Sequence, residues 1–286
     1  MAGEQAGKGG SRMRPSITIA ENETNAAKAF SRQSAVFDNL YGTDAIIRYK
    51  RERVRQHVEQ LLTPAASILE LNAGTGEDAL YFAQKGYSVH ATDISEDMLL
   101  QLRAKKQQAG IGECLSSEPC DFTRLGDLER RGPYDHIFSN FAGLNCTQRL
   151  EKVLQDLPPL LKPGGTISLV ILPKFCLWEF MLLFRGRFRT AFRRFSGTKG
   201  ASARVEGTYF RCWYYNPSFV VRALPEFEVM NIEGLCTLVP PSYLEGFAEK
   251  YPGLFGSLCR MESKWKSSWP WRLIGDYYII SLRKRS

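Results

Sequence analysis

The sequence lacks the features of a membrane-spanning or disulfide-stapled protein. Its 286 residues contain no uninterrupted apolar run of the roughly 18–20 residues that a membrane-spanning helix needs. Its seven cysteines are scattered and form no Cys-x-x-Cys pair, which argues against a zinc site of that kind and indicates a reduced protein. The stretch from Met1 to Arg14 is Gly-rich and basic but has no apolar segment, so no secretory signal is predicted. We therefore expect a cytoplasmic protein, with membrane association as an alternative to be weighed below.

Apolar residues are abundant, and the one compositional oddity is charge. A hydrophobic share of 44% with 24% charged residues excludes disorder throughout and is ample for a packed core. Lysine and arginine number 38 against 30 acidic residues, which gives a formal net charge of +8. Such an excess is compatible with nucleic acid, a membrane surface or an anionic substrate as a partner.

Changes in sequence texture predict a tail followed by a single domain. Residues 1–22 mix Gly, Ser, Lys, Arg and Pro without periodicity, and we predict a disordered tail there. The domain, 23–286, is predicted to comprise a helical cap (23–63), a cofactor-binding core of alternating strands and helices (64–172), an insertion or lid (173–215), and a C-terminal helix with the last strands of the sheet (216–286).

The core and the C-terminal part predict an α/β fold. Short apolar runs alternate with helical segments of roughly 10–15 residues, the pattern of a parallel sheet with helices on both faces. We expect a doubly wound, mostly parallel seven-stranded sheet with a helical insertion after the fifth strand. The predicted strands are 66–71, 87–92, 111–115, 134–139, 166–172, 227–232 and 277–282. The predicted helices are 77–85, 95–106, 148–161 and 216–224, and residues 239–275 are predicted to form a helical excursion.

A glycine-rich loop stands between the first predicted strand and the next helix. In Glu70-Leu71-Asn72-Ala73-Gly74-Thr75-Gly76, the glycines let the backbone approach a ligand, and the helix N-terminus beyond offers unpaired N–H groups. Asp93 ends the next strand, where a carboxylate can accept hydrogen bonds from both hydroxyls of a ribose. Together these features predict an adenosine-containing ligand at the carboxyl ends of the strands.

The loop also fits a second cofactor. Gly74-x-Gly76-x-x-Ala79 matches the dinucleotide fingerprint, so an NAD(P)-binding oxidoreductase is an alternative interpretation. Tyr81 and Lys85 imitate a dehydrogenase pair. However, they lie on the helix behind the loop, where they would face the packing layer rather than a substrate, and we give them no catalytic role.

Taken in order, the motifs between Phe30 and Leu172 resemble those of the class I S-adenosylmethionine (SAM)-dependent methyltransferases. The loop from Glu70 resembles the first motif of that family, except that Asn72 stands where the family has its first glycine. Three further segments resemble the motif after the third strand, the fourth-strand motif and the turn before the fifth strand; they are 120–122, 134–141 and 160–165.

The resemblance implies SAM as the cofactor and assigns residues to it. It implies that Glu70 lies near the ammonium group, Asp93 on the ribose, and Asp121 at the adenine amino group. Met98 is the position where the family often packs an apolar side chain on the adenine. The full set of cofactor-binding residues that it implies is Glu70, Asn72, Ala73, Gly74, Gly76, Asp93, Ile94, Met98, Asp121, Phe122, Asn140 and Phe141.

Charge favours SAM over a dinucleotide. Glu70, Glu77 and Asp78 gather around the loop and would repel a pyrophosphate, which SAM does not carry. The loop keeps the residue types that cofactor binding needs. This disfavours a third interpretation, in which the protein is a non-catalytic methyltransferase-like interaction subunit.

The reaction is predicted only in outline. We expect methyl transfer to a small, hydrophobic acceptor, with oxygen as the favoured acceptor atom and nitrogen or carbon as alternatives. Displacement from a sulfonium gains most of its acceleration from alignment and desolvation, and a general base is needed only for poorly acidic hydroxyls or protonated amines. The candidates for acceptor contact are Phe37, Tyr41, Asn145, Tyr209 and Tyr214, with Tyr215 beside them.

Histidines are few. Of the three, His90 and His136 fall in predicted strands and are expected in the core, while His57 is predicted on a solvated helix face. No histidine–carboxylate pair or metal-ligand set is recognisable in the sequence, so we assign no catalytic base and no metal.

The insertion concentrates the basic charge. Seven basic residues and no acid lie in the range 185–204. Phe184, Phe188 and Phe192 recur every four residues and are predicted to share one helical face, each followed directly by an arginine. Three interpretations stay open: a lid over an acceptor pocket, an interfacial helix over 175–195 that contacts a membrane, and a packed helix with a solvated basic face. Nucleic acid is not expected as the partner, and the oligomeric state is not predicted.

Overall fold

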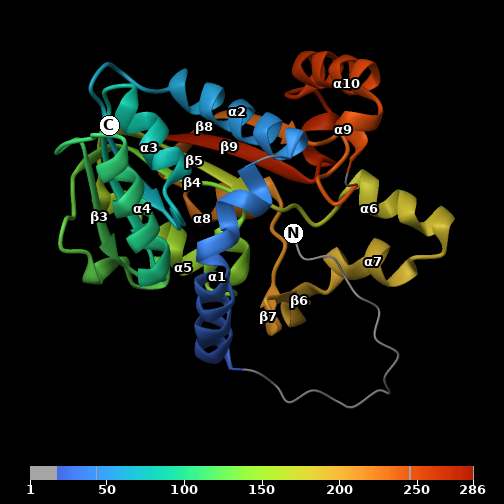
Figure 1. Ribbon diagram of the computed structural model, residues 1–286, viewed down its shortest axis with the longest axis horizontal. Coiled ribbons are helices and arrows are strands. Elements are labelled where there is room, and N and C mark those ends of the chain that lie inside the picture. The colour runs from blue at the N-terminus through green and yellow to red at the C-terminus, as the bar shows by residue number, and fades with distance from the viewer. Residues whose placement is uncertain (1–17, 43, 245, 286) are drawn as a thin grey trace.

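The computed structural model describes residues 18–42, 44–244 and 246–285 (Figure 1). Its central strands are β1 (Ser67–Leu71), β2 (Ser88–Asp93), β3 (Leu115–Pro119), β4 (Tyr134–Ser139), β5 (Leu161–Ile171), β8 (Phe227–Leu235) and β9 (Tyr277–Lys284). They form one sheet in the order β3-β2-β1-β4-β5-β9-β8. β1 to β5 are parallel, and β9 runs antiparallel to both β5 and β8. The predicted mostly parallel seven-stranded α/β fold is confirmed.

Helices cover both faces of this sheet because its strands carry apolar side chains on both sides. One face carries α2 (Ala45–Glu59), α3 (Glu77–Gln84) and α4 (Glu96–Gln108), and the other carries α5 (Leu150–Gln155) and α8 (Pro217–Ala223). Adjacent residues of β1 show the alternation: Ile68 packs in the cluster with Val54 of α2, whereas Leu69 packs in the cluster with Leu154 of α5.

Several element boundaries differ from the sequence-based expectation. β3 begins at residue 115 rather than 111, and the helix expected over 148–161 ends at 155 because β5 already begins at 161, where Leu161 pairs with Tyr134. α1 (Ile19–Gly42) begins inside the segment expected as tail. The side chain of Asn22 explains this extension, since its Nδ2 donates to the carbonyls of Cys146 and Arg211 and its Oδ1 accepts from the Arg211 N–H.

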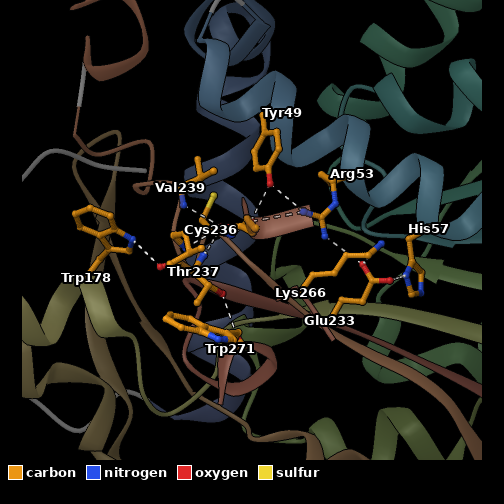
Figure 2. Close-up of polar contacts among 12 residues, drawn as sticks. Tyr49, Arg53, His57, Trp178, Glu233, Cys236, Thr237, Val239, Lys266 and Trp271 are labelled. Carbon is orange, nitrogen blue, oxygen red and sulfur yellow. Dashed lines mark hydrogen bonds and ion pairs between the residues drawn. The ribbon is translucent and has the colours of Figure 1, made fainter. Parts of the chain in front are cut away.

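A buried ionic network holds α2 against β8 and β9 (Figure 2). Arg53 lies 3.1 Å from Glu233, and His57 contacts both Glu233, at 3.0 Å, and the Ser281 hydroxyl, at 2.7 Å. Burial opposes ionisation of Glu233, but His57 and Lys266 lower its pKa to about 2. The prediction that His57 lies on a solvated face is wrong, because its partners come from the far end of the chain.

The insertion is not the single amphipathic helix expected. It forms α6 (Leu177–Met181), a short 3-10 turn and α7 (Phe188–Phe192), with a break at Gly186, whose φ is +69°. The C-terminal part of the insertion forms an antiparallel hairpin of β6 (Ala201–Val205) and β7 (Thr208–Cys212), which the sequence analysis did not predict. The helical excursion expected over 239–275 is present as α9 (Phe247–Lys250) and α10 (Pro252–Trp265). Within the described ranges, none of the helices combines the length and the apolarity that crossing a bilayer demands.

Candidate active site

A cavity opens at the carboxyl ends of β1, β2 and β4, beneath α1. It encloses about 980 Å³ when its open mouth is included. All of the cofactor residues implied by the resemblance line it, with the exception of Gly76. Their juxtaposition follows from the parallel order, since consecutive strands end at the same edge of the sheet. That they bind a cofactor remains a prediction.

The glycine loop uses three left-handed residues. Asn72, Gly74 and Gly76 have φ values of +48°, +56° and +80°. Asparagine is among the residues that tolerate this region, so the departure from glycine at position 72 leaves the loop geometry intact. The Asn72 side chain donates to the Asn140 carbonyl at 2.9 Å and accepts from the Ser139 hydroxyl at 2.6 Å, which ties the loop to the end of β4.

Two glycines make room around this loop. At Gly76 a β-carbon would lie 2.4 Å from Leu102, so glycine is required there for the packing of α3 on α4 rather than for lining the cavity. At Gly143 a β-carbon would lie 2.5 Å from the Asn72 side chain. The asparagine at 72 therefore occupies space that only a glycine at 143 provides.

Asp93 closes the loop from the second strand. Its carboxylate accepts from the Gly74 N–H at 2.9 Å and the Ser95 N–H at 2.8 Å. Burial raises the pKa of Asp93, and the N–H donors of Ser95 and Gly74 lower it in part. Each oxygen keeps a lone pair, so the carboxylate can still accept hydrogen bonds from a ligand.

Asp78 anchors a charged network beside the loop. Arg51 and Arg55 of α2 each lie 2.7 Å from its carboxylate, and the Asn140 amide donates to it at 2.8 Å. Burial opposes ionisation, but the two guanidinium groups hold the pKa of Asp78 below its ordinary value. Arg51 also lines the cavity and lies over the Phe141 ring at 4.8 Å. Sequence reasoning missed both arginines, although their spacing of four places them on one face of a helix.

Glu70 is an orphaned buried acid at the cavity. Its side chain is 2% exposed, and its Oε2 has no hydrogen-bond partner within the described part of the chain. Burial and the neighbouring Asp78 raise the pKa of Glu70 well above its ordinary value, while Arg51 and Arg55 oppose the rise. A buried acceptor without a donor costs free energy unless a ligand supplies one. A cationic group such as the ammonium of SAM fits this position.

The N-terminal helix contributes residues that sequence reasoning did not name. Glu23, Ala26, Ala27 and Phe30 of α1 line the cavity. The side chain of Glu23 is held by Thr147 at 2.8 Å and by an ion pair with Arg149. α1 belongs to the segment predicted as a helical cap (23–63), and the side chains of the acceptor candidates Phe37 and Tyr41 on the same helix lie outside the described residues.

The other acceptor candidates lie away from the cavity wall. Asn145 is fully buried, and its amide donates to the carbonyls of Trp213 and Leu172 while accepting from the Leu172 N–H. Tyr209 lies on β7 under the guanidinium of Arg204, and Tyr214 lies beneath that of Arg194. The polar atoms of Asn145 are thus used to hold the end of β5 and the segment after β7 together.

His136 lies in the core, and the acids nearest to a metal-ligand arrangement already bind an arginine. His136 donates to or accepts from Thr166 at 2.7 Å, and burial lowers its pKa to about 3. In the described ranges, the group closest to a metal-ligand arrangement is Cys176, Glu179 and Asp276. The Arg194 guanidinium donates to both carboxylates, at 2.6 and 2.7 Å, and so occupies the position that a cation would take.

Two arginines of the insertion are therefore engaged in ion pairs, and one of them is buried. Arg194 is 3% exposed and binds Glu179 and Asp276, while Arg193 makes a two-point contact with Glu179 at 2.7 and 2.8 Å. Burial opposes ionisation of Glu179, yet Arg193 and Arg194 lower its pKa to about 2. The basic helix face considered in the sequence analysis is therefore corrected at its C-terminal end. There, Arg193 and Arg194 bind acids, namely Glu179 of α6 and Asp276 in the segment before β9.

The sequence is similar to those of known proteins. Residues 68–165 match a family described as a methyltransferase domain. A SAM-dependent Diels-Alderase of Talaromyces variabilis is 35% identical over 112 residues, which is 38% of either chain. A malonyl-[acyl-carrier protein] O-methyltransferase of Buchnera aphidicola is 26% identical over 163 residues, or 56% of this chain and 59% of that one. The matches span less than two thirds of the length of these relatives.

A solved structure agrees over nearly the whole chain. It is the Burkholderia thailandensis 1,6-didemethyltoxoflavin-N1-methyltransferase with bound 1,6-didemethyltoxoflavin and S-adenosylhomocysteine, with a TM-score of 0.57 and 16% identity. The similarity covers 96% of this chain and 93% of the other. At this identity it establishes the shared fold alone.

Proposed function

Because the chain carries the methyltransferase domain of the class I SAM-dependent family, we propose that it transfers a methyl group from SAM to a small, predominantly apolar acceptor, with oxygen as the acceptor atom. SAM supplies an activated methyl group on a sulfonium. The protein then has to bind the cofactor, orient the acceptor and exclude water.

The orphaned carboxylate of Glu70 is the observation that carries the proposal. It lies in a cavity that also presents Glu77, Asp78 and Asp93, while Arg51 and Arg55 are already paired with Asp78. Such a wall favours a ligand with cationic ammonium and sulfonium groups and disfavours the pyrophosphate of a dinucleotide. The glycine spacing of the loop is therefore compatible with NAD(P), but the acidic side chains of the cavity wall disfavour it.

The described side chains suggest how the cofactor would be held. Asp93 has lone pairs for the ribose hydroxyls, and Met98, Ile94 and Phe122 offer apolar surface for the adenine. Asp121, whose carboxylate accepts from the Thr123 N–H at 2.7 Å, lies within the same wall for the adenine amino group. α1 covers the cavity with Ala26, Ala27 and Phe30, which would remove water from around the methyl group.

Support for an oxygen acceptor comes from the relatives. The Buchnera aphidicola protein is named as an O-methyltransferase, whereas the Burkholderia thailandensis protein is named for nitrogen, which keeps N-methylation as the alternative. We assign no general base, which suits an acceptor that is ionised or already nucleophilic at neutral pH.

The direct test uses SAM labelled in its methyl group with a panel of apolar hydroxy and carboxylic acids. The expected result is a labelled product together with S-adenosylhomocysteine. A converted acceptor without label transfer would instead support a second candidate, a SAM-dependent ring-forming enzyme, which the relationship to the Talaromyces variabilis protein brings into consideration. Heat of binding from NAD but not from SAM would overturn both.

The raised pKa of Glu70 predicts a pH-dependent affinity for SAM. Because burial and the neighbouring Asp78 raise the pKa of Glu70, the carboxyl of the free protein stays protonated to a higher pH than an ordinary glutamate, and only the carboxylate attracts an ammonium group. Affinity should therefore rise with pH, by up to about tenfold per unit, until the free carboxyl is ionised, and then level off. Calorimetry across mildly acidic to neutral pH measures this slope.

The Glu70→Gln variant should bind SAM more weakly and lose the slope. Asp97→Asn, a change at an exposed acid at the start of α4, serves as the matched control and should keep it. An unchanged slope in Glu70→Gln would remove Glu70 from the ammonium site.

A further inference from the structure

The turn between α6 and α7 projects from the body of the protein. In Figure 1 these helices form the right-hand edge, away from the sheet and from α4 on the left. Every residue from 184 to 189 is exposed, in the sequence Phe-Arg-Gly-Arg-Phe-Arg. The left-handed Gly186 lies in the middle of this run and turns the chain back toward α7.

Large apolar side chains gather on this projection. Phe184 is 87% exposed and Phe188 is 62% exposed. Leu182 and Ala191, which precede and follow this stretch in the chain, are buried. We use the term tip patch for the exposed apolar residues Met181, Phe184, Phe188, Phe192 and Phe195. A cluster of this kind on a protruding turn marks a contact surface rather than scattered surface residues.

The charge on the same projection is of one sign. Arg185, Arg187 and Arg189 are exposed, and in the ranges that the structure describes no acid lies within ion-pairing distance of them. The sequence contains no acid from residue 180 to residue 205. The acids nearest in sequence cannot neutralise the tip, because Glu179 is buried and already bound by Arg193 and Arg194.

The base of the projection is fixed to the domain. The Arg194–Glu179–Asp276 cluster is buried, and the Leu177 N–H donates to the Ile274 carbonyl at 2.9 Å. The Trp178 indole donates to the Thr237 carbonyl at 3.1 Å, as Figure 2 shows. The tip patch is thus presented on a rigid support rather than on a free loop.

We infer that the tip patch docks the protein on an anionic lipid bilayer. Phe184 and Phe188 enter the boundary between headgroups and acyl chains, and the three exposed arginines bind lipid phosphates, their aliphatic stems lying along the apolar layer. A convex tip with phenylalanines between arginines suits a deformable anionic surface. A second copy of the chain would bring like charges together, which disfavours self-association through this tip.

Vesicle flotation of the full chain tests this inference without any acceptor. The wild-type protein should float with vesicles of phosphatidylcholine mixed with phosphatidylglycerol, and about tenfold or more weakly with phosphatidylcholine alone or at high salt. Phe184→Asp/Phe188→Asp should lower the partition coefficient by at least about tenfold. Arg185→Glu/Arg187→Glu/Arg189→Glu should abolish the preference for the anionic lipid.

Matched controls are available outside the insertion. Leu100→Asp on α4 and Arg131→Glu introduce the same types of change at exposed positions and should leave flotation unchanged. SAM binding should be equal in all variants, so a failure of docking is distinguishable from a failure of the proposed methyl transfer. The inference is overturned if the wild type does not float, if the tip variants float like the wild type, or if the tip variants instead convert a dimer to a monomer.

Discussion

Replacing Arg194 with methionine is expected to lower the free energy of unfolding by about 3–5 kcal/mol. The guanidinium is 3% exposed and donates to Glu179, Asp276 and the Asp276 and Pro173 carbonyls. Without it, Arg193 is the one cation among the described residues that still pairs with Glu179, and none of them pairs with Asp276. Urea unfolding monitored by circular dichroism measures the difference.

The control for this effect is Arg189→Met, which removes an exposed arginine of the same segment and should change stability by less than about 0.5 kcal/mol. The variant Arg194→Met/Glu179→Gln/Asp276→Asn removes the stranded charges together with their partner. It should recover part of the loss, because the cost arises from uncompensated buried carboxylates. Equal stability of Arg194→Met and wild type would show that the cluster contributes nothing to the fold.

The same cluster fixes a direction for the pH dependence of stability. Since the pKa of Glu179 is lowered from 4.5 to about 2 in the folded protein, its contribution is present above about pH 4.5. It is lost as the pH falls from there toward 2. Arg194→Met should show a smaller fall across this window.

Replacing Asp93 with alanine is expected to weaken SAM binding by at least tenfold, about 1.4 kcal/mol or more. The change removes the acceptor that faces the cavity and also the acceptor for the Gly74 and Ser95 N–H groups. Both losses act on the cofactor loop, so the effect should exceed that of a single ligand hydrogen bond. Calorimetry with S-adenosylhomocysteine measures the affinity without turnover.

A double-mutant cycle separates the two contributions. If Asp93 contacts the ribose, a 2′-deoxy cofactor should lose less affinity in Asp93→Ala than in the wild type, because the contact is already missing. Asp97→Ala, at an exposed acid of the same segment, should leave the affinity unchanged. An unchanged affinity in Asp93→Ala would remove Asp93 from the site.

The fold and the cofactor loop were predictable because their signals are local. Strand–turn–helix texture located β1, β2 and β4 within one residue, and glycine spacing located the loop. That asparagine is acceptable at position 72 also follows from local properties, because asparagine is one of the residues that adopt the left-handed region. Of the boundaries that moved, those of α1 and β5 depend on contacts with distant segments.

What the sequence determined by itself, then, is the order of the strands and helices and the chemistry of the loop between them. Only the tertiary structure decided which charged and polar side chains are paired. Arg55 meets Asp78 across 23 positions, His57 meets Ser281 across 224, and Arg194 meets Asp276 across 82. Hydrophobic periodicity cannot report such partners, because it states which face of an element is buried and not what lies opposite. The basic excess shows the consequence: at one end of the insertion the arginines are structural, and at the tip they remain exposed for a partner.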